Sequence, residues 1–273
     1  MLFDSHAHIN YDGYDDAELR NAIAAIEASD VGAAVDVGFD IKSSVAAVAH
    51  AAKYPWCYAA VGVHPHEAAK MDEDKFARLA ELSRMAGVVA IGEIGLDYYR
   101  NLSPKEDQHV WFRRQIRLGL ERRLPIIIHD RDSEGDTMNI LVEEGAFGSE
   151  RRAAFPKNPQ TGRESAGILL HCFSGSAEQA LECIEMGATI SIAGPVTYKK
   201  NIKTALVAER TPLSHLLIET DAPYLAPEPF RGKPNISPYV YYTAKRIAEL
   251  KGVDVAEVET ATWVNARRFF RIE

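Results

Sequence analysis

An eight-stranded (β/α)8 TIM barrel, a fold of the α/β class, is indicated by two features of this chain. Eight short apolar segments rich in Val, Ile and Leu alternate with polar stretches that carry helical signals. Each apolar run is nearly continuous, which is typical of parallel strands covered on both faces. A doubly wound open sheet is the alternative, but it would scatter the candidate site residues. The expected strands are residues 2–8, 31–38, 56–62, 88–94, 124–129, 167–172, 187–193 and 214–221.

Two of the intervening helices carry clear boundary signals. Residues 103–106 read Ser-Pro-Lys-Glu, which combines a capping box with a proline in the first turn. Apolar residues then recur at every fourth position from Phe112. A second apolar stripe runs from Val240 to Ala248, and this helix is expected to end near Gly252.

The length fits a single folded unit. A chain of 273 residues could hold about two average domains, yet barrels of this type reach the same size as one domain. We therefore expect residues 1–273 to form one (β/α)8 hydrolase domain. Residues 147–167 are interpreted as an irregular insertion, because they hold two prolines and several Gly, Ser and Arg residues. This stretch runs from a helix to the sixth strand, so it should lie on the helix-to-strand face, away from the usual active-site rim.

Cysteine content and the missing membrane signals indicate the compartment. Cys57, Cys172 and Cys183 form an odd number without a CxxC spacing, which argues against a disulfide framework or a thiolate zinc site. The first eight residues hold no basic region that leads an apolar stretch, so a signal peptide is not expected. No apolar run is long enough to span a bilayer. We expect a cytoplasmic protein with no membrane association and no obligate protein partner.

Residue types that bind metals recur where the predicted strands end. His6 and His8 should project to the same side of the first strand, about 7 Å apart along the backbone. Asp4 lies deeper on that strand and is expected to orient a ligand histidine. Because the carboxyl ends of barrel strands converge at one rim, six side chains should meet there. These are His6, His8, Glu93, His129, His171 and Asp221.

The chemistry of this set points to hydrolysis. Each residue taken alone could have a structural role, such as Glu93 as a solvated helix cap or Asp221 as the cap of a turn. Together, six imidazole and carboxylate groups suffice for two divalent cations that share one bridging group. Such cations lower the pKa of a shared water and neutralise charge on a reacting phosphate. A mixed nitrogen and oxygen donor set suits Zn or Mn.

These residues lie in motifs that resemble the TatD family of metal-dependent deoxyribonucleases, among the amidohydrolase-type barrels. The resemblance covers essentially the whole chain in the family's order. Residues 147–167 depart from it, since family members run more directly into the next strand. Residues 235–238 are one residue longer than the usual Asn-x-Pro, which could alter the substrate rim. The motifs are Phe3-Asp4-Ser5-His6-Ala7-His8, Val61-Gly62-Val63-His64-Pro65-His66, Ile91-Gly92-Glu93-Ile94-Gly95-Leu96-Asp97-Tyr98-Tyr99, Ile128-His129-Asp130-Arg131-Asp132, His171-Cys172-Phe173-Ser174-Gly175, Glu219-Thr220-Asp221-Ala222-Pro223-Tyr224-Leu225, Arg231-Gly232-Lys233 and Asn265-Ala266-Arg267-Arg268-Phe269-Phe270.

The resemblance implies how the six residues share two divalent cations. One cation would be held by His6, His8, Glu93 and Asp221, and the second by Glu93, His129 and His171, with Glu93 bridging. It also adds Mg to Zn and Mn as a working ion. Asp221, a ligand next to the activated water, is the hypothesis for the general base, so Asp221 and Glu93 are the expected catalytic residues.

Substrate contacts are expected around this centre. His64 and His66 follow the third strand, where they could bind phosphate oxygens, support the metal ligands or pack against loops. Arg131 could clamp a phosphate or pair with Asp97 or Asp132.

The net charge of −8 would repel nucleic acid on average, but the local charge matters more. The strand-to-helix loops carry basic and aromatic residues together, which is typical of a groove for a single strand. The alternative is that the tyrosines cover the helices of the barrel. The residues are Arg100, Arg131, Lys199, Lys200, Arg231 and Lys233, beside Tyr98, Tyr99, Tyr198, Tyr224 and Phe230, with Arg231 a candidate substrate contact.

Three functions fit this pattern. The first is an exonuclease-like deoxyribonuclease that cleaves the phosphodiester bonds of single-stranded or end-exposed DNA with a metal-activated water. The second is an amide or ester hydrolase, such as an aminoacyl-tRNA deacylase, because metals polarise a carbonyl as readily as a phosphoryl group. The third is a non-catalytic barrel that binds nucleic acid, and the retention of every metal-ligand type argues against it.

Overall fold

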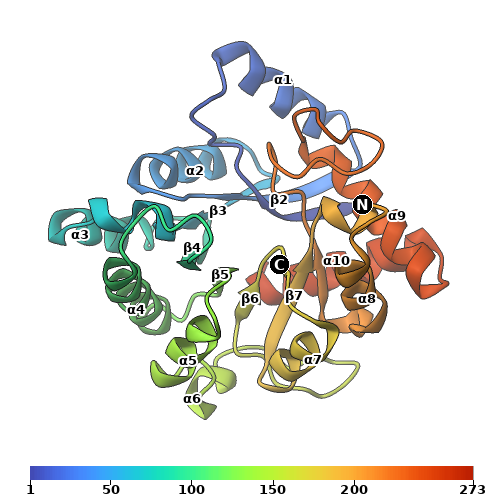
Figure 1. The fold of residues 1–273 in the computed structure, drawn as a ribbon. Helices are drawn as coiled ribbons and strands as arrows, with labels where there is room; N and C mark the ends of the chain where they lie inside the picture. The colour runs from blue at the N-terminus through green and yellow to red at the C-terminus, as the bar shows by residue number, and fades with distance from the viewer. Residues whose placement is uncertain (273) are drawn as a thin grey trace.

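The computed structural model, which describes residues 1–272, contains eight parallel strands in one sheet whose order is β1 to β8 (Figure 1). The predicted barrel is therefore confirmed. Strand β4 continues three residues past its expected end. The eighth strand is shorter than expected at both ends, since a 3-10 turn takes up its start and it ends at Ile218. The strands are β1 Leu2–Ala7, β2 Val31–Val37, β3 Cys57–Val61, β4 Val88–Asp97, β5 Ile126–Arg131, β6 Ile168–Leu170, β7 Ala188–Ile192 and β8 Leu216–Ile218.

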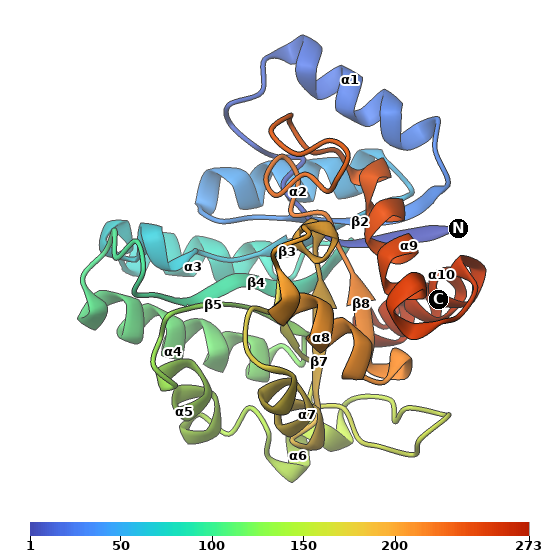
Figure 2. The same cartoon turned by 45° about the vertical axis from the view of Figure 1, so that its right-hand side comes forward.

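Helices connect the strands and cover the outside of the sheet (Figures 1 and 2). The α-helices are α1 Asp16–Glu27, α2 Ile41–Lys53, α3 Glu73–Leu82, α4 Lys105–Glu121, α5 Asp136–Glu143, α6 Ser149–Ala153, α7 Ala177–Glu185, α8 Ile202–Arg210, α9 Val240–Lys251 and α10 Val255–Phe270. The 3-10 helices are η1 Pro65–Lys70, η2 Gly194–Thr197, η3 Leu213–His215 and η4 Ser237–Tyr239. No helix within residues 1–272 combines the length and the apolar character needed to cross a membrane.

The two predicted helix boundaries had different outcomes. Helix α9 ends at Gly252, whose left-handed φ of 67° is the conformation that favours glycine at a helix end. The capping box expected before α4 was wrong. Pro104 precedes that helix without a side-chain cap, and the Ser103 hydroxyl is used by η1 instead. It donates to the His66 carbonyl at 2.8 Å and accepts from the Ala69 N–H at 3.0 Å.

Two apolar layers lie on opposite faces of the sheet because side chains alternate along each strand. The inner layer includes Val35, Ile127 and Leu217, and helix α10 adds two aromatic rings to it. Phe270 stacks on Phe3 near the start of β1, with ring centroids 5.8 Å apart. The amino end of the barrel is therefore filled with apolar side chains.

Backbone and side-chain hydrogen bonds join the residues after the last strand to the first strand. Among the described residues, the regular ladders run only from β1 to β8. At the junction, the Asp221 N–H donates to the His6 carbonyl at 2.9 Å and the His8 N–H donates to the Ala222 carbonyl at 2.7 Å. The buried Asp4 carboxylate accepts from the Thr220 N–H at 2.9 Å and from the Thr220 hydroxyl at 2.6 Å. The Ser5 hydroxyl donates to the Ile218 carbonyl at 2.9 Å. Asp4 was expected to orient a ligand histidine, but its main contacts tie the barrel shut, and burial raises its pKa to about 7.

Two ladder irregularities coincide with candidate site residues. The register between β1 and β2 shifts between Asp4 and Ala7, around His6. The register between β4 and β5 shifts between Ile91 and Ile94, around Glu93. A bulge re-aims a side chain, and such bulges are common beside active sites.

Gly95 allows β4 and β5 to approach closely beside the bulge at Glu93. Its φ is 149°, in the region that favours glycine, and an added Cβ would lie 1.8 Å from the His129 carbonyl oxygen. Any larger residue at this position would push His129 out of place.

Residues 147–167 connect α5 with β6 and lie next to the amino ends of β5 and β6 (Figure 2). The segment is helical in part, because it contains α6, and to that extent the expectation of an irregular stretch was wrong. The buried Arg151 of α6 donates to the Ala166 carbonyl at 2.8 Å and to the Leu124 carbonyl at 2.6 Å.

We expect Gly95→Ala to lower the free energy of unfolding by about 3 kcal/mol or more, because the methyl group combines strain with overpacking against a backbone atom. Gly232→Ala is the matched control, since Gly232 also has a left-handed φ but no atom lies near the added Cβ. The control should lose only about 1–2 kcal/mol. Urea denaturation of both variants measures this, and equal losses would show that close packing at Gly95 is unimportant.

Candidate metal centre

The six residues predicted as metal ligands all lie in the carboxyl halves of the strands or just after them. His6 lies in β1, within the register shift between Asp4 and Ala7. His8 is the first residue after that strand. Glu93 lies in β4 and His129 in β5. His171 follows the short strand β6, and Asp221 lies shortly after the short strand β8. The structure brings all six together.

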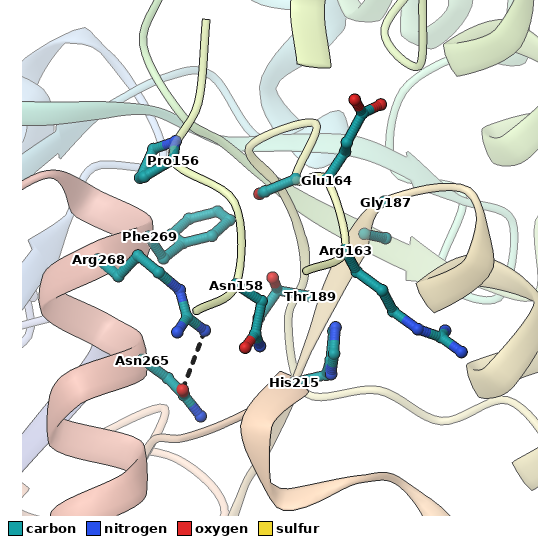
Figure 3. A pocket seen from close by; sticks show the side chains of 12 residues that line it. Pro156, Asn158, Arg163, Glu164, Gly187, Thr189, His215, Asn265, Arg268 and Phe269 are labelled. Carbon is teal, nitrogen blue, oxygen red and sulfur yellow. Dashed lines mark hydrogen bonds between the residues drawn. The ribbon is translucent and has the colours of Figure 1, made fainter. Parts of the chain in front are cut away.

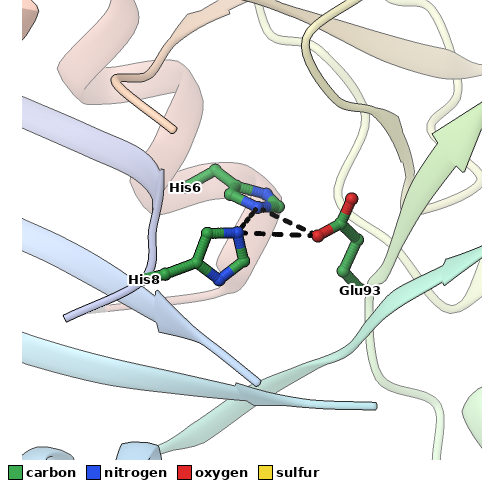
Figure 4. A group of neighbouring side chains, drawn as sticks. All are labelled: His6, His8 and Glu93. Carbon is green, nitrogen blue, oxygen red and sulfur yellow. Dashed lines mark hydrogen bonds and ion pairs between the residues drawn. The ribbon is translucent and has the colours of Figure 1, made fainter. Parts of the chain in front are cut away.

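The Glu93 carboxylate lies between two sets of imidazoles. Its Oε2 is 3.5 Å from His6 Nε2 and 3.7 Å from His8 Nε2 (Figure 4). Its Oε1 is 2.7 Å from His129 Nδ1 and 2.7 Å from His171 Nε2. The residue is only 3% exposed. Each oxygen of this one buried carboxylate therefore faces a different pair of histidines.

Asp221 completes the first set. Its Oδ1 lies 3.4 Å from His8 Nε2 and 3.8 Å from His6 Nε2. The two Nε2 atoms are themselves 3.3 Å apart, and Figure 4 shows them facing the Glu93 carboxylate. With Asp221, two imidazole nitrogens and two carboxylates point at one place. Within residues 1–272, the buried His6 Nδ1 has no hydrogen-bond partner, so this ring is held by its Nε2 side.

Donor atoms of this kind at this spacing fit divalent cations. Three groups have ligand atoms within 4.8 Å of one another. Glu93 belongs to two of them. The groups are His6 with His8 and Glu93, His6 with His171 and Asp221, and His64 with Glu93 and His129.

The centre favours ionised carboxylates although it is buried. Burial alone would raise the pKa of Glu93, but the charge of His171 and hydrogen bonds from His129 and His171 hold it well below its usual range. The pKa of Asp221 is lowered in the same way, chiefly by its hydrogen bond with His8. Burial would lower the pKa of His8, but Asp221 raises it to about 9. Both carboxylates are thus in the form that binds cations.

Two further carboxylates stand behind the histidines. His129 donates from Nε2 to Asp97 Oδ2 at 3.2 Å, and His171 donates from Nδ1 to Glu219 Oε1 at 3.3 Å. Glu219 is fully buried and also accepts from the Ser191 hydroxyl at 2.5 Å. Such partners fix the ring orientation of a ligand histidine and increase its basicity.

Sequence reasoning gave neither Asp97 nor Glu219 this role. Their position in the sequence could have indicated this role, because each is an acidic residue at a predicted strand end, close to a predicted ligand. Nothing in the sequence shows which histidine each one reaches.

The two histidines predicted as substrate contacts lie beside the centre. His64 is buried, and its Nε2 is 3.6 Å from Glu93 Oε1. His66 donates from Nε2 to Asp97 Oδ2 at 2.8 Å, so it shares that carboxylate with His129.

The two arginines predicted as substrate contacts are exposed and lie outside the cluster. Arg131 stacks over the Tyr99 ring, with 4.1 Å between its guanidinium carbon and the ring centroid. It makes no ion pair in the described part of the chain, so the pairing with Asp97 or Asp132 weighed above is not formed. Arg231 stacks over Tyr198 at 4.4 Å. Each pair offers a cation and an aromatic face together.

A separate cavity lies between the 147–167 segment and α10 (Figure 3). Asn158, His215 and Arg268 are among its lining residues. Its volume of about 20 Å³ holds about one water molecule, so it is too small for a nucleotide.

Comparison with known proteins finds metal-dependent hydrolases among the relatives of this chain. A 45% identical relative that matches over 100% of both chains is an uncharacterized metal-dependent hydrolase, YabD, from Bacillus subtilis. Another, 32% identical over 98% of this chain and 97% of its own, is the 3'-5' ssDNA/RNA exonuclease TatD of Cronobacter sakazakii. The crystal structure of the TatD homologue YjjV from Escherichia coli superposes with a TM-score of 0.84, at 26% identity, and covers 100% of this chain and 98% of that one.

The family model described as TatD related DNase matches residues 3–271, which is nearly the whole chain. The expected resemblance is therefore confirmed, and the chain belongs to the TatD related DNase family of metal-dependent hydrolases.

Proposed function

We propose that this protein is a two-cation phosphodiesterase that shortens single-stranded nucleic acid, DNA above all, from an exposed end. The observation that carries the proposal is the buried Glu93 carboxylate, whose two oxygens face two separate pairs of histidines. The exonuclease name of the Cronobacter relative supports the choice of substrate. The cytoplasmic location expected from the sequence stays a prediction.

We infer which residues would hold each cation from the six donors and from the family resemblance. His6, His8, Glu93 and Asp221 would hold one cation, and Glu93, His129 and His171 would hold the other. When bound, Mg²⁺, Mn²⁺ or Zn²⁺ would lower the pKa of a water molecule and neutralise charge on the phosphate.

The protein's own groups would do the rest. Asp221 lies at the open side of the centre, 15% exposed, where its carboxylate can take the proton of an attacking water. The Arg131 and Tyr99 pair and the Arg231 and Tyr198 pair offer charge for phosphates and ring faces for bases. An exposed single strand can reach both kinds of group at once.

The direct test uses single-stranded DNA labelled separately at each end. Metal-stripped protein, resupplied with Mg²⁺, Mn²⁺ or Zn²⁺, should shorten the strand stepwise and reveal the direction of digestion. Glu93→Ala should reduce the rate by roughly 10³-fold or more, because both cations lose a ligand. Glu81→Ala, at an exposed helical position, is the control and should digest normally. If folded, metal-loaded protein leaves the strand intact, the function lies with amide or ester substrates such as aminoacyl-tRNA.

Asp221→Asn should reduce kcat by about 10²–10⁴-fold, the contribution typical of a general base. The amide keeps a ligand oxygen, so much of the metal should remain bound. Metal analysis of the purified variant, beside its turnover of single-stranded DNA, measures both quantities. Near-normal turnover would rule out the proton-accepting role.

Glu219→Gln should weaken cation binding by about 10–100-fold, because a neutral amide polarises His171 less than a carboxylate does. The matched control is Glu144→Gln, a largely buried carboxylate that pairs with Arg113 and Arg117 on the outside of the barrel. Titration of metal-free protein with Zn²⁺ or Mn²⁺ in a calorimeter gives the affinities. Equal affinities in the two variants would show that Glu219 only fills space.

A further inference from the structure

His64 is held in a defined orientation by a backbone hydrogen bond. It is the residue before η1, and its Nδ1 accepts from the His66 N–H at 3.1 Å. A backbone N–H can only donate, so Nδ1 must present its lone pair. A neutral imidazole carries one proton, which therefore lies on Nε2.

The protonated nitrogen points into the metal centre. Nε2 is 3.6 Å from Glu93 Oε1, just beyond hydrogen-bond distance, and no closer acceptor is found for it in residues 1–272. The ring packs edge-on against His129, with centroids 4.3 Å apart, and the residue is 8% exposed. The centre thus holds an N–H donor on a largely buried residue, and this donor makes no hydrogen bond within residues 1–272.

The neighbourhood keeps this orientation in place. His66 is fixed by its side-chain bond to Asp97 at 2.8 Å, and its carbonyl accepts from Ser103 at 2.8 Å. The His64 backbone is also fixed, because its N–H donates to the Phe39 carbonyl at 2.9 Å. Turning the ring over, or moving the proton to Nδ1, would leave the His66 N–H without its acceptor.

We propose that His64 is a substrate-binding hydrogen-bond donor whose Nε2–H contacts a non-bridging oxygen of the reacting phosphate, and that it is not a cation ligand. Both roles, donor and cation ligand, are geometrically available, because His64, Glu93 and His129 have ligand atoms close enough to hold a cation. A nitrogen that carries a proton has no free lone pair for a metal. The inference rests on the proposed function, since it names a group that binds the phosphate of that substrate.

Three variants separate a donor from a ligand. The side-chain amide nitrogen of Gln can reach the position of imidazole Nε2, whereas that of Asn reaches only the position of Nδ1. His64→Ala and His64→Asn should lower kcat by about 10²–10³-fold, the effect of losing one donor to a reacting oxyanion. His64→Gln should recover at least about tenfold of that loss. Affinity for Zn²⁺ or Mn²⁺ should stay within about threefold of wild type in all three.

The opposite pattern overturns the proposal. If His64→Ala and His64→Gln both lose cation affinity by more than about tenfold, His64 is a ligand. If kcat falls in all three variants without recovery in His64→Gln, the role is structural.

Two further measurements do not depend on nuclease activity. Binding of inorganic phosphate to the metal-loaded protein should weaken by about tenfold or more in His64→Ala, and unchanged binding overturns the donor role. Two-bond ¹⁵N–¹H correlation spectra of the Zn²⁺-loaded protein should show His64 protonated at Nε2, and protonation at Nδ1 overturns it. Wild-type protein that digests no nucleic acid would refute the proposed function, while these two results would still decide the role of His64.

Discussion

The structure of the rim depends on how an apolar barrel tolerates buried ionisable side chains at one end. An isolated buried charge is costly, and it persists in proteins when it is paired or binds a metal. Here the free-energy cost of burying charge is offset because carboxylates and imidazoles alternate: each carboxylate lies among imidazoles, and each imidazole lies beside a carboxylate. Glu93 is the centre of this arrangement, since its two oxygens contact both halves. Removing its charge would leave several histidines facing one another.

The backbone is shaped to make this alternation possible. A regular ladder would place His6 and Glu93 by strand periodicity alone, but both lie where the register shifts. Gly95 lets β4 approach the His129 carbonyl so closely that no side chain fits between them. Asp4 and Thr220 close the barrel below, which holds Asp221 opposite His8. The opposite end of the barrel is filled by the aromatic rings of α10, which do not belong to the site.

Sequence patterns were sufficient for the fold and for the identity of the six residues at the rim. Strands are recognised by their apolar runs, and parallel topology then brings their carboxyl ends together. The bulges were not predictable, because one extra residue in a strand leaves no trace in hydrophobicity. The partners of Asp4 and Ser103 were missed for a related reason. A short polar side chain has several hydrogen-bond partners within reach, and only the tertiary arrangement decides between them.

In four histidines of the centre, the hydrogen bond on the far side of the ring determines what the near side can do. His8 donates from Nδ1 to the Val37 carbonyl at 2.8 Å, and His129 and His171 donate to carboxylates. In a neutral ring, an acceptor behind the ring holds the one proton there and leaves a lone pair toward the centre, as a cation requires. His64 has the opposite partner, a backbone N–H, so its lone pair faces away and its proton faces inward. The same residue type at one rim can therefore serve as ligand or as donor, and the hydrogen bond on the far nitrogen selects between the two.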